Sequence, residues 1–202
     1  MDKRDPVLMS KRIVVIDGHP DPARERFCHA LAGAYADAAE AAGHQVRRIT
    51  VADLDVPVLR NAQDWAKGTA TSDVRNAQEA IAWAEHLVIL YPLWLGSMPA
   101  LLKAFFEQVF RPGFALKEEK GKGWPVGLFA GKSARVVVTM GMPALIYRLF
   151  FLSHSLKSLE RNILRFSGIK PIRESVIGSV ESSAAHREKW LQEMRALGHE
   201  GR

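Results

Sequence analysis

The segment HLVILYPLWLGSMPALLKAFFEQVF, from His86 to Phe110, reads as a buried strand, an apolar loop and a helix that opens at a proline. Its strand, at 86–91, is continuously apolar, which is typical of parallel strands covered on both faces. The loop carries Trp94 and Leu95, although burial is hardest to arrange in a loop. An apolar loop at the end of a buried strand predicts a flat binding partner.

The same alternation of strand and helix runs through the chain. Further strands are predicted at 12–17, 45–51, 134–140 and 171–180. Helices are predicted at 23–42, 73–85, 99–110, 144–166 and 183–197. Parallel strands need crossovers, and right-handed crossovers place helices on both faces of the sheet. Five such strands fit a doubly wound parallel sheet in the order 2-1-3-4-5.

Length and composition favour a single α/β domain over residues 1–202, with a flexible N-terminus at 1–11 and an insertion or hairpin near the site at 111–132. Cys28 is the only cysteine, so an intramolecular disulfide and a zinc site with several thiolates are excluded, and the reducing cytoplasm is the expected compartment. No run of about 18 apolar residues occurs, which argues against a membrane span. The net charge of +6 is scattered and not interleaved with aromatic residues, so we expect no nucleic-acid partner.

In such a sheet the ligand crevice lies at the carboxyl ends of the strands, where three loops meet. The first loop leads into a helix whose opening amides favour an anion, and His19, Arg24 and Arg26 add donors suited to a phosphate. A capped surface loop is the alternative reading. The segment GLFAGKS, at 127–133, has three residues between its glycines and precedes a strand, so it is not a P-loop.

The second and third loops supply apolar and backbone groups. Trp94 and Leu95 would lie at the pocket mouth, with the amides of 93–96 facing the polar edge of a ring, although Trp94 could equally be core. Tyr147, after the third loop, either bonds a ligand or fills the core. There is no nucleophile elbow and no metal-ligand spacing. A pocket with flat walls, amide donors and an anion seat favours chemistry carried by a bound cofactor, and a flavin fits this description.

Four segments carry a family resemblance. The stretch at 86–116 resembles the flavin-binding core of the NAD(P)H:quinone oxidoreductase family, with its P-L-x-W-x-x-x-P-A-L-L-K-like motif and a following G-F-A. RIVVIDGHPDPARERFCHAL (12–31), VVVTMGMPALIY (136–147) and NILRFSGIKPIRESVIGSV (162–180) are similar to the family's opening strand and helix, third loop, and closing helix and strand. The likeness covers about 12–180, in family order.

The resemblance implies a flavodoxin-like homodimer that binds FMN or FAD and works by a ping-pong reaction. In that reaction NAD(P)H gives a hydride to flavin N5, and a quinone then receives two electrons. Tyr147 and His154 would be the catalytic residues that steady developing charge. The cofactor-binding residues would be His19, Arg26, Phe27 and Cys28 at the phosphate, Pro92, Leu93, Trp94, Leu95 and Gly96 at the ring edge, and Thr139, Met140, Gly141 and Met142 on the other side.

The resemblance also implies an apolar channel for nicotinamide and quinone, formed by Trp94, Met140, Phe150 and a Trp124 contributed by the partner subunit. Two departures from the family pattern concern the site. This chain has ERFC where many relatives have Ser and Asn in the phosphate loop, and Trp94-Leu95 where they have Gln-Trp. Arg26 would then replace hydroxyl donors by a charge-assisted contact.

A second function class remains open from the sequence. Some members of the family accompany potassium-efflux transporters as regulatory subunits, and the basic strip at 117–122 and the last helix would be the docking surface. A flavodoxin-type electron carrier is disfavoured because such carriers present an acidic surface and this chain is basic. The choices between FMN and FAD, between NADH and NADPH, and between quinone, nitroaromatic and azo acceptors stay open.

Overall fold

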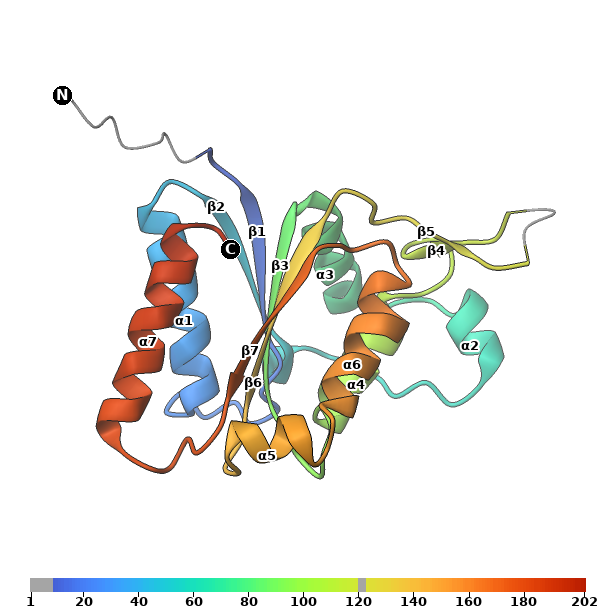
Figure 1. Cartoon of the computed structure of the whole chain (residues 1–202). Coiled ribbons are helices and arrows are strands. Elements are labelled where there is room, and N and C mark those ends of the chain that lie inside the picture. The colour runs from blue at the N-terminus through green and yellow to red at the C-terminus, as the bar shows by residue number, and fades with distance from the viewer. Residues whose placement is uncertain (1–8, 120–122) are drawn as a thin grey trace.

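The computed structural model describes residues 9–119 and 123–202. Its centre is a parallel sheet of five strands in the order β2-β1-β3-β6-β7 (Figure 1). These strands are β1 (Arg12–Asp17), β2 (Gln45–Thr50), β3 (His86–Pro92), β6 (Ser133–Thr139) and β7 (Ile172–Ile177). Counted within this sheet, the order is 2-1-3-4-5, so the predicted doubly wound sheet is confirmed.

Helices cover both faces of the sheet because its strands are apolar on both sides (Figure 1). One face packs against α1 (Phe27–Ala41) and α7 (Ala184–His199), and its core includes Val88 and Leu90 of β3. The other core contains Leu87 and Ile89 and extends under α3 (Ser72–Trp83) and α4 (Ala100–Val109). The same face carries α5 (Ala144–Leu149), α6 (His154–Ser158) and the π-helical segment η2 (Leu159–Arg165). None of the helices in the described part of the chain is long and apolar enough to cross a membrane.

Two predicted helices differ from the structure, and two short elements were not predicted. The first helix begins at Phe27, not at Ala23, because 18–26 folds into a loop held by its own side chains. The predicted helix at 144–166 is wrong as one piece, since Leu152 and Ser153 adopt left-handed backbone angles (φ 51° and 52°) and end the first helical stretch. The short helix α2 (Ala62–Lys67) and the 3-10 turn η1 (Val51–Asp53) had no sequence signal.

The region between α4 and β6 contains a small antiparallel pair, β4 (Leu116–Lys117) and β5 (Val126–Gly127). Residues 120–122, which include part of the predicted basic strip at 117–122, lie outside the described residues. So do residues 1–8 of the N-terminus that was expected to be flexible.

Candidate functional site

The loops at the carboxyl ends of the strands are joined edge to edge by backbone hydrogen bonds. Gly18 N donates to Leu90 O at 2.7 Å, and Leu93 N donates to Thr139 O at 2.7 Å. Beyond them, Ser179 N donates to Met142 O at 3.1 Å. The loops after β1, β3, β6 and β7 therefore form one continuous rim, and the three loops singled out from the sequence lie side by side in it.

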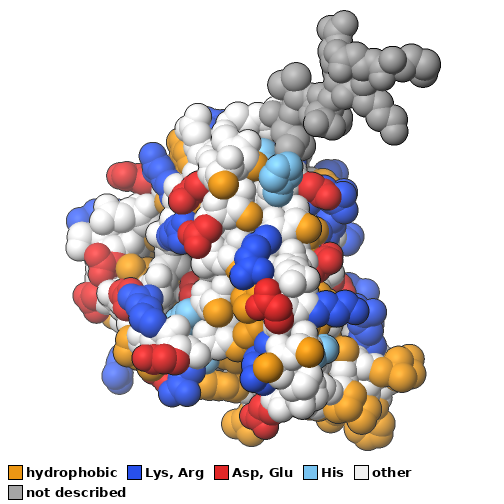
Figure 2. All heavy atoms as spheres, turned by 90° about the vertical axis from the view of Figure 1, so that its left-hand side faces the viewer, with side chains coloured by type: hydrophobic (Ala, Val, Ile, Leu, Met, Phe, Trp, Pro, Cys, Tyr) orange, Lys and Arg blue, Asp and Glu red, His pale blue; other side chains and the backbone are white. Residues whose placement is uncertain are grey.

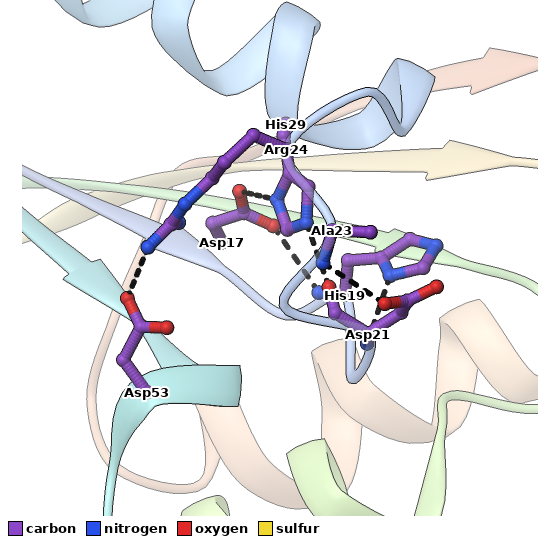
Figure 3. A network of polar contacts seen from close by, with 7 residues as sticks. All are labelled: Asp17, His19, Asp21, Ala23, Arg24, His29 and Asp53. Atoms are coloured by element: carbon purple, nitrogen blue, oxygen red, sulfur yellow. Dashed lines mark hydrogen bonds and ion pairs between the residues drawn. The ribbon is translucent and has the colours of Figure 1, made fainter.

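The first loop is organised by a buried network of carboxylates and imidazoles (Figure 3). Asp17, the last residue of β1, places Oδ2 2.5 Å from Nδ1 of His29 and accepts from His19 N at 3.2 Å. His29 Nε2 lies 2.8 Å from Asp21 O, and Asp21 N donates to His19 Nδ1 at 3.1 Å. The His29 ring is therefore held between two oxygen atoms, one on each side.

This network fixes where the predicted phosphate residues lie. His19 is buried and its pKa is lowered by burial and by nearby His29. Its Nδ1 accepts a hydrogen bond, so the ring proton belongs on Nε2, which has no partner in the described part of the chain. The Cys28 thiol is buried, and its pKa is raised by burial and by Asp17. Any contact of Cys28 with a phosphate would therefore come from its backbone amide.

Two arginines of the first loop point to different partners. Arg26 pairs with Asp21, at 2.7 Å from Nε to Oδ2. Figure 3 shows Arg24 extending to Asp53, at 2.6 Å from Nη2 to Oδ2. The Asp21 pKa is lowered by the Ala23 amide and by Arg26. Helix α1 starts directly after Arg26 with no side-chain cap and no acidic residue in its first turn. Its opening amides, including those of Phe27 and Cys28, are thus available to an anion.

The second loop is a tight turn with exposed apolar corners. Trp94 N donates to Ser97 O at 2.9 Å and Ser97 N donates back to Trp94 O at 3.0 Å, while Leu95 and Gly96 take positive φ angles of 47° and 77°. Two central residues with φ above zero are the mark of a type I′ turn. Within the described residues, nothing accepts from the amides of Leu95 and Gly96.

The apolar residues of this turn lie at the surface. Trp94 is 50% exposed and Leu95 is fully exposed, so neither is core. The Trp94 ring meets His19 edge-on at a centroid distance of 5.9 Å, which joins the second loop to the first. Pro92 is buried beneath the turn and Leu93 is half-buried.

The third loop presents backbone groups to the rim more than side chains. Thr139 and Met140 are buried, Gly141 is exposed and Met142 is half-buried. Tyr147 is 1% exposed, and its hydroxyl lies 2.7 Å from Ser155 Oγ and accepts from Leu156 N at 3.2 Å. His154 is exposed at the start of α6. The catalytic roles of Tyr147 and His154 stay predictions, and a Tyr147 hydroxyl that served a ligand would have to share its contact with Ser155.

Sequence reasoning missed the acidic and imidazole partners that hold the first loop, namely Asp17, Asp21 and His29. The available signal was an aspartate at the end of a buried strand followed twelve residues later by a histidine. With the helix expected to begin at Ala23, this spacing did not predict a contact between Asp17 and His29, because the turn at 21–26 determines which way His29 faces.

The residues present fit a flavin mononucleotide. The uncapped start of α1 with Arg26 and His19 Nε2 suits a phosphate, and the free amides of Leu95 and Gly96 suit the polar edge of a ring. These groups lie on one rim, and exposed Trp94 provides the flat apolar surface beside them. The rim is open to solvent, so a ring bound there would have to be shielded from water by groups other than the described residues of this chain.

A hydrophobic surface lies next to this rim. Helix α5 and the residues after it expose five large apolar side chains by between 48% and 79%: Leu145, Ile146, Leu149, Phe150 and Leu152. We call this set the α5 face. Figure 2 shows hydrophobic side chains gathered at the lower rim, where Figure 1 places α5. Contiguous exposed apolar surface of this kind marks an interaction site.

Comparisons with known proteins agree with the architecture. A family model described as a flavodoxin-like fold matches residues 11–197. An uncharacterized NAD(P)H oxidoreductase of Haemophilus influenzae is 26% identical over 187 residues, covering 91% of each chain. An FMN-dependent NADH:quinone oxidoreductase of Colwellia psychrerythraea is 29% identical over 161 residues, covering 71% of this chain and 81% of that protein. The crystal structure of a putative quinone reductase from Klebsiella pneumoniae superposes with a TM-score of 0.81 at 22% identity, over 93% of this chain and 83% of that one.

Proposed function

The chain belongs to the family with the flavodoxin-like fold, and from this premise we propose that it is an FMN-dependent NAD(P)H:quinone oxidoreductase. One observation carries the proposal. The turn after β3 holds two unpaired amides, of Leu95 and Gly96, on the same rim as the uncapped start of α1. The names of the relatives from Haemophilus and Colwellia support the choice of substrate and cofactor.

The chain's own residues bind and orient. The amides at the start of α1, with Arg26 and His19, hold the phosphate, and the amides of Leu95 and Gly96 fix the ring edge. Exposed Trp94 and Leu95 exclude water from the ring. When bound, FMN supplies the hydride-accepting and hydride-donating chemistry that alternates between NAD(P)H and the quinone. Tyr147 would stabilise the charge that develops, if its hydroxyl turns from Ser155 towards the rim.

We further propose that the working unit is a homodimer in the cytoplasm. The α5 face would be buried between subunits, and Trp124, which is 78% exposed, would cover the partner's rim. The buried, unpaired Cys28 suits a reducing compartment. No observation among the described residues favours the alternative of a transporter-associated regulatory subunit, so that role is not proposed.

The first test is chemical. The purified protein is denatured, the released flavin is identified by absorbance and chromatography, and NAD(P)H oxidation is followed with menadione as acceptor. We expect FMN, and two-electron reduction of menadione. A protein that stays colourless after addition of FMN or FAD and is inert towards NADPH with menadione would refute the proposal.

A matched pair of variants tests the turn after β3. Gly96→Ala places a side chain at φ 77° and should displace both free amides, raising the FMN dissociation constant about tenfold. Gly113→Ala imposes similar backbone strain at φ 86°, also with no atom within 4 Å of the added carbon, but it lies outside the rim. Equal FMN affinity in the two variants would remove the role assigned to the turn.

A further inference from the structure

A cavity of about 290 Å³ opens at the amino ends of the strands, on the edge of the sheet opposite to the rim. The residues that matter come from five segments that are distant in sequence: Lys11, His86, Ser133, Lys170, Arg173 and Arg202. They lie just before or at the starts of β1, β3, β6 and β7, and at the chain end after α7. Figure 1 shows this chain end beside the upper ends of the strands.

The lining of the cavity is cationic. It includes four basic side chains and no carboxylate side chain. Arg202 is paired with Glu200 at 2.7 Å, and Lys11 Nζ donates to a neutral acceptor, Gly201 O, at 2.8 Å. For Lys11, Lys170 and Arg173, no carboxylate partner exists among the described residues. Positive charges that line a concave site raise the local concentration of anions.

A buried arginine, Arg135, lies next to the cavity and adds to its positive electrostatic potential. Arg135 is 6% exposed, and it donates to Ser175 Oγ at 2.8 Å and to Arg202 O at 2.9 Å. Its pKa is lowered by burial and by the neighbouring Arg173 and Arg202, while Tyr35 and Glu193 act in the opposite direction. The guanidinium groups of Arg173 and Arg202 thus add to the effect of burial on Arg135, which shows that cations gather at this end of the sheet.

His86 places an unsatisfied polar atom in this setting. The residue lines the cavity, is 4% exposed and holds Nδ1 2.8 Å from Ser133 Oγ, while Nε2 has no partner in the described part of the chain. Burial, together with Lys11, Arg135 and Arg173, lowers its pKa to about 3, so the ring is neutral at pH 7. The Ser133 hydroxyl can donate to Nδ1, and in that tautomer Nε2 carries the hydrogen and is a donor that lacks an acceptor.

We propose that this cavity is a binding site for a phosphate group, either as inorganic phosphate or at the end of a small phosphate monoester. A dianion with several acceptor oxygens matches two lysines, one arginine and the orphan Nε2 of His86. The volume admits a phosphate with a small substituent. A bound phosphate would connect the amino ends of four strands with the end of the chain. The site is independent of the FMN site because it occupies the other edge of the sheet.

The test follows the imidazole signals of His86 by NMR while inorganic phosphate is added at constant ionic strength, with chloride as the comparison. FMN-loaded protein is used so that the phosphate seat at α1 is filled, and if the chain takes no FMN the same His86 signals still report this cavity alone. We expect a saturable shift of the His86 signals and a higher His86 pKa in phosphate than in chloride. A parallel titration with glycerol phosphate distinguishes a monoester from the free ion, and saturation by either supports the site.

Charge-neutral variants complete the test. Arg173→Gln and Lys170→Gln should each weaken phosphate binding about tenfold, whereas Lys189→Gln, an exposed lysine on α7, should leave it unchanged. If neither phosphate compound saturates the His86 signals, or if all three variants bind alike, the proposal is overturned. Saturation of the signals by a DNA duplex in place of both compounds would also overturn it.

Discussion

Glu160 lies in η2 with only 8% of its surface exposed, and its carboxyl group lies next to that of Glu174 on β7. Burial and Glu174 raise the pKa of Glu160 from its ordinary value of 4.5 to about 7, against the opposing charges of Arg165 and Arg161. Between these two pH values the folded chain therefore holds a proton that the unfolded chain releases. The stability from this group is complete below pH 4.5 and is lost as the pH rises through about 7.

The replacement Glu160→Gln keeps the shape of the protonated side chain and cannot ionise. At about 1.36 kcal/mol per pKa unit the ceiling of the effect is about 3 kcal/mol. Glu174 is exposed, so solvent screening reduces the expected gain at pH 8 to about 1–2 kcal/mol. Urea unfolding at pH 5 and pH 8 measures this gain in the free energy of unfolding of the variant over the wild type. In thermal unfolding, the Tm of the variant relative to the wild type should rise by about 2–6 °C from pH 5 to pH 8.

Two controls make this result decisive. Glu174→Gln removes the partner charge but leaves Glu160 buried, so it should give a smaller gain at pH 8, whereas Glu79→Gln, on the exposed surface of α3, should change stability equally at both pH values. A Glu160→Gln difference that is flat from pH 5 to pH 8 would show that the carboxyl group is not protonated in the folded protein at neutral pH, and the argument from burial would fall.

Three further changes test packing, assembly and chemistry. Gly178→Ala would place a carbon 2.2 Å from Ala144 N and should lower the free energy of unfolding by about 1–3 kcal/mol in urea, whereas Gly33→Ala, with no atom within 4 Å, should not. Leu149→Glu on the α5 face should convert the dimer to monomers in light scattering after size exclusion, and Val58→Glu, at similar exposure, should not; a wild-type monomer would contradict this. Tyr147→Phe should lower menadione turnover about tenfold with unchanged FMN affinity, and unchanged steady-state kinetics would remove the catalytic role of the hydroxyl.

The sheet could be predicted because burial on both faces leaves a simple signature. The strand at 12–17 was placed without error, and Ile16 lies opposite Ile49 and Ile89 in the register that a doubly wound sheet requires. The convergence of the loops followed from topology alone, since parallel strands place all their carboxyl ends at one edge. The exposure of Trp94 could not be decided from composition, because core and pocket mouth both favour tryptophan.

The break between α5 and α6 could not be read from the sequence. No proline or glycine lies between Ala144 and Phe166, and the apolar spacing continues across the break. The turn is instead held by Tyr147, whose carbonyl accepts from Ser153 N at 3.1 Å and whose hydroxyl accepts from Leu156 N. A contact between a buried side chain and a backbone amide nine residues away competes with helix propensity only in the folded protein.

The basic side chains at the two edges of the sheet differ in whether they are paired with carboxylates. At the rim, Arg26 and Arg24 are each neutralised by an aspartate, so anion affinity there depends chiefly on the uncapped amides at the start of α1. At the amino edge, Lys170 and Arg173 have no carboxylate partner among the described residues and face a neutral histidine. Dipoles of fixed amides act at short range, whereas unpaired charges act over about a Debye length and are screened by salt. Added salt should therefore weaken phosphate binding at the amino edge more than FMN binding at the rim, because the first depends more on unpaired charges.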